Sequence, residues 1–391
     1  MIRTGFVNFS EGQSWLGGLH YVRNLLQAIA SLEHRRIEPV LFAGETAGPG
    51  ILAGLPIMPV VRSAMFDRMR VAWAWRKMLR LGSGKDVALG NLLARNRISV
   101  LSHSGHLGAG ASIPSIGWIP DFQHRHLPEL FSKPEFDLRE RQIAETCALC
   151  TRVVVSSETA ARDLRTFSPV NADRLRVLHF ASGLLHGRPL PDRAELEARH
   201  GIDGPYLHVP NQFWVHKNHE ILIAALELLQ KQERFLSIVA TGHMADPRRP
   251  EHMGRLLARL NRGGLARRFR TLGVIPYEDM LGLMRDAVAV INPSLFEGWS
   301  TSVEEAKSLG KQILVSDIAV HREQAAARAT YFDPKDASAA AAAIWQVWST
   351  YDRDEDDRAM QQAAAGLPAR IQSFGRAYEA IVVDAAERGG A

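Results

Sequence analysis

The strongest chemical pattern in the sequence lies in residues 291–317, INPSLFEGWSTSVEEAKSLGKQILVSD. An apolar run typical of a buried strand leads into a loop with Glu297, and a helix is expected to begin near residue 301 or 302. Glu305 then lies about one turn into that helix, so both carboxylates can face one cleft and accept hydrogen bonds from sugar or ribose hydroxyls. The free N–H groups at the helix start, with the hydroxyl residues 300–302, suit a diphosphate. The alternative is a surface helix whose acids are solvated.

Two further strand–loop–helix patterns place chemically useful residues after a strand. Residues 209–229, VPNQFWVHKNHEILIAALELL, carry Lys217 in the loop, where an ammonium can stabilise a leaving diphosphate; the alternative is a solvated surface lysine. Residues 271–284, TLGVIPYEDMLGLM, place an apolar turn and then Tyr277 between a strand and a helix. Ligands of open parallel sheets bind at the carboxyl ends of the strands, which is where these loops are expected.

The scaffold for these loops is predicted by an alternation of strand-like and helix-like segments, as in β-α-β units, over both halves of the chain. Residues 181–204, rich in Gly and Pro, read as a linker with a short charged helix. A length of 391 residues makes two domains the default. We expect two doubly wound α/β domains with a cleft between them, residues 1–186 and 187–368, and a helix at 369–391 that packs back on the first domain. The strand-like segments are 4–9, 37–44, 97–105, 112–121, 151–158, 204–211, 235–242, 269–275, 287–294 and 312–317.

The segment from Glu297 to Glu305 resembles the E-x7-E region of retaining glycosyltransferases of family 4. These enzymes have the GT-B fold, in which two Rossmann-like domains face each other across a cleft. The resemblance implies that Glu297 binds hydroxyls of the transferred sugar, that Glu305 binds the ribose diol, and that the helix start holds the diphosphate. The donor-binding residues implied in this segment are Glu297, Gly298, Trp299, Ser300, Thr301, Ser302 and Glu305.

The segment around Lys217 is similar to the first strand–loop–helix of the C-terminal domain in that family, where a basic pair contacts the donor phosphates. Lys217 fits the lysine of the pair. Gln212 stands near the place of the usual arginine, which is a departure from the family pattern. Phosphate binding is then expected to rest on Lys217, with Asn211, His216 or Asn218 assisting.

The turn after the strand in residues 271–284 looks like the turn that lines the nucleobase in the family, mostly through backbone groups. This implies a base pocket of Val274, Ile275 and Pro276, on which Tyr277 could stack. The alternative is a simple connection between strand and helix. Backbone contacts leave no side-chain pattern, so the identity of the base is not predicted.

In the N-terminal half, SEGQSWLGGLHYVRNLL resembles the family's glycine-rich first loop. Gly17 and Gly18 would let the backbone approach the donor phosphates or the acceptor, with a helix beginning near Leu19. The segment SIGWIPDFQHRHLPELF resembles the strand that normally ends in a His-Asp pair, but Pro120 stands at the histidine position and Asp121 follows it. His124 is the expected substitute. His126, His103 and His106 are alternatives, and each of these histidines could equally be structural.

The resemblance implies a retaining hexosyltransferase of class EC 2.4 that moves a sugar from a nucleotide-diphosphate sugar to a glycan, lipid-linked or small-molecule acceptor. Its catalytic set is Glu297, Lys217, Asp121 and His124, without a metal or a further cofactor, and the donor is of UDP, GDP or dTDP type. Three other functions stay open: a GT-B-fold nucleotide-sugar epimerase, a non-catalytic nucleotide-sugar-binding module, and a hydrolase with paired carboxylates. Polysaccharide biosynthesis is the expected context.

The charge pattern excludes some partners and suggests another. The net charge of +5 is modest and its basic residues are scattered, so nucleic-acid binding is not expected. Residues 62–85, RSAMFDRMRVAWAWRKMLRLGSGK, are an exception, because a basic amphipathic helix with Trp can lie on an anionic membrane. The alternative is a surface helix that packs its apolar stripe on the domain.

The remaining composition indicates the compartment. The chain has no apolar run of the roughly 18 residues that span a bilayer, and MIRTGFVNFSEG lacks the features of a secretory signal. We therefore expect a cytoplasmic protein, with peripheral contact at the inner membrane face through residues 62–80. Cys147 and Cys150 are expected to be buried thiols at a helix end, because no second Cys pair completes a zinc site.

Overall fold

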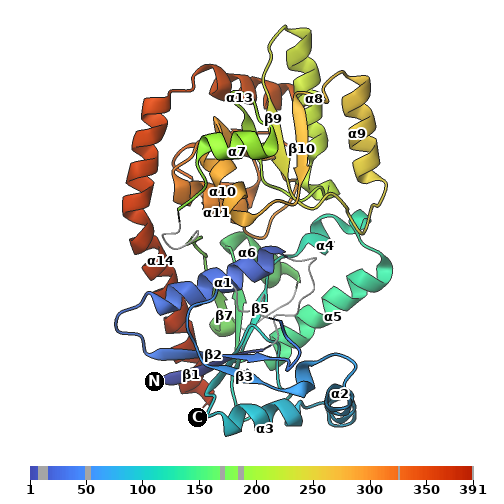
Figure 1. The fold of residues 1–391 in the computed structure, drawn as a ribbon. Helices are drawn as coiled ribbons and strands as arrows, with labels where there is room; N and C mark the ends of the chain where they lie inside the picture. The colour runs from blue at the N-terminus through green and yellow to red at the C-terminus, as the bar shows by residue number, and fades with distance from the viewer. Residues whose placement is uncertain (8–15, 49–53, 168–171, 184–188, 325, 390–391) are drawn as a thin grey trace. The chain divides into compact units, whose positions relative to one another are not determined.

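The computed structural model describes residues 1–7, 16–48, 54–167, 172–183, 189–324 and 326–389 (Figure 1). The chain divides into two units, of which the first comprises residues 1–181 with 369–391 and the second comprises residues 182–368. Each unit has its own parallel β-sheet with helices in the connections between strands.

The first unit has, among the described residues, a seven-stranded sheet in the order β3-β2-β1-β4-β5-β6-β7, and every pairing is parallel. Its strands are β1 (Ile2–Val7), β2 (Ile37–Ala43), β3 (Val60–Arg62), β4 (Val100–Ser102), β5 (Ser115–Ile119), β6 (Arg152–Val155) and β7 (Leu175–Val177). Its helices are α1 (Leu16–Ala30), α2 (Val71–Ser83), α3 (Val87–Arg95), α4 (Gln123–His126), α5 (Lys133–Leu149) and α6 (Glu158–Phe167), with the end of α14 (Arg353–Gly389).

The second unit has, within the described part, a six-stranded parallel sheet in the order β10-β9-β8-β11-β12-β13. Its strands are β8 (Leu207–Val209), β9 (Ile238–Thr241), β10 (Phe269–Gly273), β11 (Ala289–Asn292), β12 (Ile313–Ser316) and β13 (Ala329–Phe332). Its helices are α7 (Arg193–His200), α8 (His219–Lys231), α9 (His252–Arg262), α10 (Tyr277–Asp286), α11 (Thr301–Leu309), α12 (Ala319–Gln324) and α13 (Ala337–Ser349).

Both faces of the second sheet are buried, which explains why its strands read as continuous apolar runs. Along β12, Leu314 joins the cluster under α8 and α13, whereas its neighbours Ile313 and Val315 join the cluster under α10 and α11. Successive side chains of a strand point to opposite faces, so one apolar run serves two helical layers. The predicted α/β class with doubly wound sheets is confirmed.

The C-terminal helix α14 passes from the second unit into the first. In the first unit its buried face includes Phe374, Tyr378 and Val382 at helical spacing. Asp384 also pairs there with the buried Arg152, whose Nη2 lies 2.6 Å from the Asp384 Oδ1. No helix within the described ranges combines the length and apolar character needed to cross a bilayer.

Two local predictions can be compared with the structure. Cys147 lies in α5 and Cys150 follows it, and both thiols are buried and free. Burial raises the pKa of the Cys150 thiol to about 11, so the thiol is not ionised at neutral pH. The segment 62–85 is not one helix, because Arg62 ends the edge strand β3 and α2 covers only Val71–Ser83.

Candidate functional site

The strand order of the second unit determines where a ligand can bind. After β8 the chain goes to β9 and β10 on one side, and β11 then returns to the other side of β8 and leads to β12 and β13. In open parallel sheets such a reversal opens a crevice at the carboxyl ends of the two central strands. The loops that follow β8 and β11, residues 210–218 and 293–300, therefore lie where a ligand of such a sheet is expected to bind.

Helix α11 begins at this crevice because Ser300 caps it. The Ser300 Oγ accepts a hydrogen bond from the Val303 N–H at 3.4 Å, and Gly310, with a φ of 73°, ends the helix in the left-handed conformation that glycine adopts readily. Among the described residues, the N–H groups of Thr301 and Ser302 are then left at the positive end of the helix dipole. Such a first turn is suited to bind an anion.

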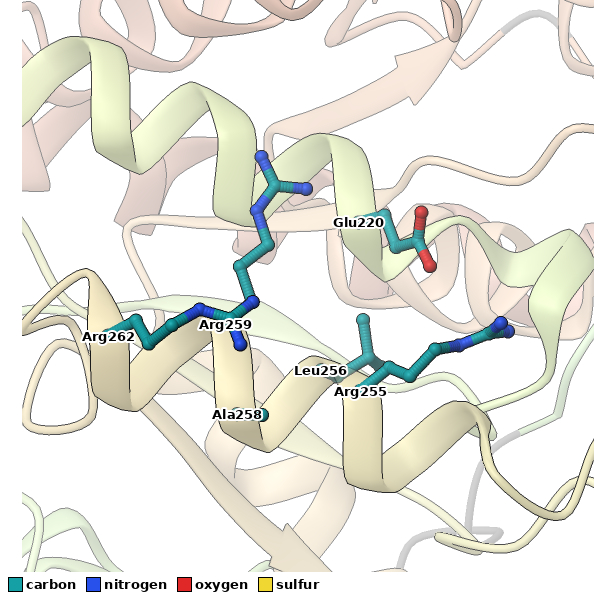
Figure 2. Close-up of a pocket in the computed structure, with 6 residues that line it drawn as sticks. All are labelled: Glu220, Arg255, Leu256, Ala258, Arg259 and Arg262. Carbon is teal, nitrogen blue, oxygen red and sulfur yellow. The ribbon is translucent and has the colours of Figure 1, made fainter.

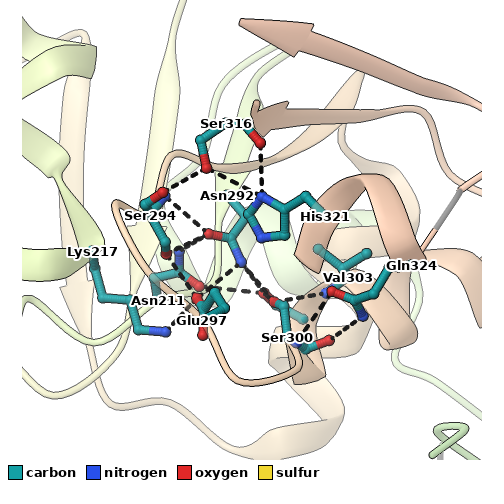
Figure 3. Close-up of polar contacts among 11 residues, drawn as sticks. Asn211, Lys217, Asn292, Ser294, Glu297, Ser300, Val303, Ser316, His321 and Gln324 are labelled. Atoms are coloured by element: carbon teal, nitrogen blue, oxygen red, sulfur yellow. Dashed lines mark hydrogen bonds and ion pairs between the residues drawn. The ribbon is translucent and has the colours of Figure 1, made fainter. Parts of the chain in front are cut away.

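Lys217 and Glu297 form an ion pair across the two loops (Figure 3). The Lys217 Nζ lies 2.6 Å from the Glu297 Oε1, and the two side chains are 16% and 10% exposed. Asn218 holds the lysine loop in place, because its Nδ2 donates to the carbonyl oxygens of Pro293 at 3.1 Å and Pro334 at 2.9 Å. The backbone of Asn218 has a φ of 57°, a left-handed conformation that asparagine tolerates better than most residues. The turn at Asn218 thus brings Lys217 to Glu297, and both are predicted site residues.

The electrostatics of this pair keep the Glu297 carboxylate ionised. Burial alone would raise the pKa of Glu297, but the Lys217 ammonium outweighs burial and lowers that pKa to about 2. Burial lowers the pKa of His216 and of His321, so both rings are neutral at pH 7. An anionic ligand must therefore share the Lys217 ammonium with a permanent carboxylate.

Asn292, the last residue of β11, connects the parts of the site (Figure 3). Its Nδ2 donates to Ser300 Oγ at 2.6 Å and lies 3.2 Å from Ser302 Oγ, while its Oδ1 accepts from Ser294 Oγ at 2.6 Å and from Asn211 Nδ2 at 3.3 Å. The Asn292 side chain is fully buried. A buried amide that satisfies several hydroxyls fixes their orientation, so this network presets the helix start for a ligand.

Helix α12 contacts the same loop through hydrogen bonds (Figure 3). The Gln324 amide binds both backbone groups of Ser300, accepting from its N at 3.2 Å and donating to its O at 3.1 Å. His321 and Ser316 form a hydrogen-bonded pair through Nδ1 and Oγ at 3.1 Å, and the Ser316 Oγ also donates to the Ser294 carbonyl at 2.5 Å. The loop between β11 and α11 is therefore fixed at its start and at its end.

Glu305 forms a second polar group, with Tyr277. The Tyr277 hydroxyl donates to Glu305 Oε1 at 2.7 Å, and Glu305 is 3% exposed. Burial raises the pKa of Glu305 to about 7, and the hydrogen bond from Tyr277 offsets only part of that effect. The two glutamates therefore differ at neutral pH, because one is always ionised and the other is balanced between its two forms.

The turn between β10 and α10 was predicted to line a nucleobase. Val274 is 64% exposed, Ile275 packs against the cluster under α7, and α10 starts at Tyr277. An exposed valine next to a tyrosine whose hydroxyl binds Glu305 is a suitable apolar platform. Gly298 and Trp299 lie half-buried in the loop before α11.

The loop after β8 lies against the end of β9. Gly242 has a φ of 139°, and a Cβ there would lie 2.5 Å from the Asn211 carbonyl oxygen and 2.8 Å from the Gln212 N. This close backbone approach requires glycine and fixes Asn211, whose side chain reaches the Asn292 network. Gln212, at the place of the expected arginine, is half-buried.

In the first unit, the described part of α1 includes Gly17 and Gly18, whereas we expected them in a loop before a helix at Leu19. The helix begins at Leu16, so the buried Tyr21 lies in its second turn. The rest of the predicted glycine-rich loop, residues 10–15, lies outside the described residues.

Asp121 and His124 hold positions that differ in access. The Asp121 Oδ1 accepts from Arg139 Nη1 at 3.1 Å and is part of a side chain that is 23% exposed. His124 is fully buried, and its Nε2 lies 2.6 Å from the Glu140 Oε1. Burial lowers the pKa of His124 although Glu140 opposes this. A buried ring with a carboxylate partner is suited to hold α4 on α5, so direct contact of His124 with an acceptor requires this packing to open.

His103 is the alternative histidine that lies at the strand reversal of the first unit, directly after β4, which neighbours β1. Its Nε2 lies 2.8 Å from the Tyr21 hydroxyl and its Nδ1 lies 2.8 Å from the Ser102 Oγ, to which the Tyr378 hydroxyl donates. Burial lowers the pKa of His103 to about 3. Its φ of 54° is unusual for histidine and is the kind of local strain that is common at functional sites.

The other two alternatives have carboxylate neighbours. The His106 Nε2 lies 3.6 Å from Glu145, and the His126 Nε2 lies 2.9 Å from Asp163. Both contacts are compatible with structural roles.

Sequence reasoning missed Asn292, Ser294, His321 and Gln324. A signal for Asn292 and Ser294 existed, since a polar residue ends each apolar run at the carboxyl end of a strand. His321 and Gln324 lie on a short helix after the next strand, and nothing in the local sequence marks them as partners of this loop.

A separate depression lies between α8 and α9 (Figure 2) and has a volume of about 260 Å³. Its wall includes Arg255 and Arg259, and Arg259 is paired with Glu227 at 2.8 Å. The depression includes none of the predicted site residues. The pairs of Arg259 with Glu227 of α8 and of Arg255 with Glu251, together with solvation, explain the arginines at this position.

Residues 205–350 match the family model described as glycosyl transferases group 1. The match covers both loops of the crevice, with Lys217, Glu297 and Glu305. No curated protein matches the sequence.

Solved structures resemble the whole chain at low sequence identity. A glycosyltransferase from Rickettsia africae ESF-5 has a TM-score of 0.66 at 12% identity, over 98% of each chain. The sucrose-phosphate synthase from Thermosynechococcus elongatus has a TM-score of 0.65 at 15% identity, over 98% of this chain and 97% of that chain. HepE from Anabaena in complex with UDP and glucose has a TM-score of 0.63 at 15% identity, over 99% of this chain and 98% of that chain.

These likenesses show that the fold is GT-B. The match of residues 205–350 to this family model adds the activity class, so the protein is a glycosyltransferase.

Proposed function

We propose that the protein is a retaining, metal-independent glycosyltransferase of family 4 whose second unit binds a nucleotide-diphosphate sugar. The observation that carries the proposal is the Lys217–Glu297 ion pair beside the start of α11, at the strand reversal of the second unit. The ammonium and the helix N-terminus match the diphosphate of such a donor, because both bind phosphate oxygens. The permanent carboxylate matches the hydroxyls of the sugar.

Each residue then has a defined task in the donor complex. The Lys217 ammonium and the N–H groups of Thr301 and Ser302 bind the diphosphate, and Glu297 accepts hydrogen bonds from hydroxyls of the transferred sugar. Glu305 accepts the ribose diol, with Tyr277 beside it. A set of this kind balances the phosphate charge through protein groups, which is the basis for proposing transfer without a metal.

The transfer step follows from these positions. The bond between the anomeric carbon and the diphosphate oxygen breaks, and the leaving diphosphate takes the electron pair while the ammonium and helix start stabilise its charge. The acceptor hydroxyl attacks on the face that the diphosphate leaves, and its proton passes to a diphosphate oxygen. The new glycosidic bond keeps the anomeric configuration of the donor, and the glutamates orient the sugar.

We assign acceptor binding to the first unit, with Asp121 at the end of β5 and His103 at the end of β4 as candidate contacts. A glycan or a lipid-linked glycan is the proposed acceptor class. UDP-glucose is the first donor to test, because similar structures were solved with UDP and glucose or with UDP-glucose.

A thermal-shift panel of UDP, GDP, dTDP and ADP tests the donor site. A nucleotide that binds only the folded state at 100 times its Kd stabilises that state by about 2.7 kcal/mol, which is a shift of several degrees in Tm. We expect one nucleoside diphosphate to give this shift, and we expect EDTA to leave the shift unchanged.

Matched variants make the test specific to the site. Lys217→Gln should abolish the shift, whereas Lys231→Gln, which changes an exposed lysine at the end of α8, should retain it. Glu297→Ala should retain nucleotide binding and lose sugar transfer, since its proposed partner is the sugar. Full transfer activity in Glu297→Ala, or a shift in the Lys217→Gln variant equal to the wild type, would contradict the proposal.

A further inference from the structure

Helix α2 presents its apolar residues to solvent. Val71, Trp75 and Met78 are 87%, 59% and 62% exposed, and with Leu79 they follow the spacing that places side chains on one face of a helix. No residue of α2 is buried. Of the fourteen large apolar side chains that are exposed among the described residues, seven lie between positions 69 and 87. An apolar surface of this concentration usually marks an interaction site.

The polar face of α2 holds the helix on the unit instead. Trp73 and Arg76 are the two half-buried residues of α2. The Arg76 guanidinium forms three hydrogen bonds with the buried Asp86 carboxylate, at 3.1, 3.0 and 2.7 Å, and lies 5.3 Å from the centre of the Phe66 ring. Surface helices normally bury the apolar face and expose the charges. In α2 the arrangement is inverted, and the alternative given above, in which this stripe packs on the domain, does not hold.

The charge around α2 restricts the partner. Residues 62–85 carry seven basic side chains and one acidic side chain, a surplus of six, although the net charge of the entire chain is +5. The single acid, Asp67, is buried and accepts hydrogen bonds from Glu45 N at 2.9 Å and Thr46 N at 3.1 Å. Lys77 and Arg80 are exposed on the same helix. A second copy of the chain would bring the same positive charge and would be repelled.

We propose that α2 lies flat in the headgroup region of an anionic lipid bilayer, with its apolar face toward the acyl chains. Thirteen residues span about 20 Å, which suits a helix in the plane of the interface. Val71, Trp75 and Met78 enter the acyl boundary, and the aliphatic stems of Lys77 and Arg80 let their cationic ends reach lipid phosphates. This proposal is independent of the donor site, since no residue of α2 belongs to it.

Sedimentation with lipid vesicles tests this proposal on the full chain. We expect the protein to bind phosphatidylcholine vesicles that contain about 30% phosphatidylglycerol, to bind pure phosphatidylcholine at least about tenfold more weakly, and to be released by salt. The double variant Trp75→Ser/Met78→Ser should weaken binding at least about tenfold, because two apolar side chains are lost. Lys77→Gln and Arg80→Gln should each weaken it about fivefold at low salt.

The controls separate the bilayer from other partners. Leu138→Ser and Phe235→Ser remove apolar side chains of comparable exposure on other elements and should bind as the wild type does. All substituted side chains are exposed, so circular dichroism should show folded proteins. Equal vesicle binding by wild type and the Trp75→Ser/Met78→Ser variant would overturn the proposal. A failure of the wild type to bind anionic vesicles would also overturn it. Dimerisation, or capture of an acidic protein, that the same variant abolishes would then identify the actual partner of α2.

Discussion

Glu305 gives donor binding a pH dependence that can be calculated. Burial holds the pKa of this carboxyl at about 7, and the ionised form accepts hydrogen bonds from the two ribose hydroxyls more strongly than the protonated form does. If the bound donor requires the carboxylate, the apparent affinity is reduced by the protonated fraction. With a pKa of about 7, the reduction is about elevenfold at pH 6 and about 1.1-fold at pH 8. The donor should therefore bind about tenfold more tightly at pH 8 than at pH 6.

Isothermal titration calorimetry with UDP-glucose at pH 6, 7 and 8 measures this effect. The nucleotide sugar is a better probe than UDP, because its diphosphate is esterified at both ends and has no ionisation in this range. Glu305→Gln should bind more weakly and with the same affinity at all three pH values. Buried His208, His219 and His103 all have a pKa lowered to about 3, so they do not titrate here. A flat wild-type profile, or a pH dependence retained in Glu305→Gln, would refute the assignment of Glu305 to the diol.

The same carboxyl gives an independent stability test. The folded-state pKa of about 7 lies above the ordinary value of 4.5, so the folded protein binds this proton more tightly than the unfolded chain does. Stability is therefore lost as pH rises from 4.5 through 7, by about 3 kcal/mol in total. Glu305→Gln should be more stable than the wild type at pH 8 by up to this amount and nearly equal to it at pH 5, as measured by urea denaturation. If the stability difference between the wild type and Glu305→Gln is the same at pH 5 and pH 8, the pKa of the Glu305 carboxyl is not perturbed.

Three further substitutions test the other parts of the site. Lys217→Gln should cost about 3 kcal/mol in urea denaturation, because it leaves the buried Glu297 carboxylate without its partner, and Lys217→Gln with Glu297→Gln should recover most of that loss. Since the Glu297 pKa is lowered to about 2, its contribution should be present above pH 4.5 and fall as pH drops toward 2, which denaturation across that range will show. Gly242→Ala places a Cβ 2.5 Å from the Asn211 carbonyl oxygen, so it should lower Tm and also weaken nucleotide binding in a thermal-shift assay. Asn292→Ala should cost about 2 to 3 kcal/mol in urea denaturation, because it leaves several buried hydroxyls without their partner.

The sequence predicted which loops of the second unit form the site, but only part of how they do so. Lys217 and Glu297 could be placed together because each follows an apolar run, and carboxyl ends of parallel strands share one edge of a sheet. Their direct ion pair was not predicted, since it depends on Asn218 bridging two carbonyl groups from distant segments. The Asn292 network was missed for the same reason, because its four partners come from the loops after β8 and β11 and from the first turn of α11, and local spacing carries no record of them.

The strands that sequence reasoning missed, β3, β7 and β13, share a physical cause. Each lies at an edge of its sheet, and most of their residues are half-buried or exposed. Most of the predicted strands are covered on both faces and show the apolar run that full burial requires, and the exception is β10, an edge strand whose residues are mostly half-buried. Apolar patterning therefore identified the centre of each sheet and, of the four edge strands in the described sheets, it identified β10 alone.

Helix α2 shows what periodicity leaves undetermined. The sequence places Val71, Trp75 and Met78 on one face at helical spacing, and the usual interpretation would direct that face toward the core. Periodicity fixes which residues share a face, but the direction of the face depends on what holds the opposite side. Here that anchor is the Arg76 guanidinium on the buried Asp86 carboxylate, ten residues away. Removing this anchor with Asp86→Asn should therefore loosen α2 and reduce vesicle binding while the apolar residues remain unchanged. If vesicle binding does not change, the orientation of the apolar face is set by other contacts.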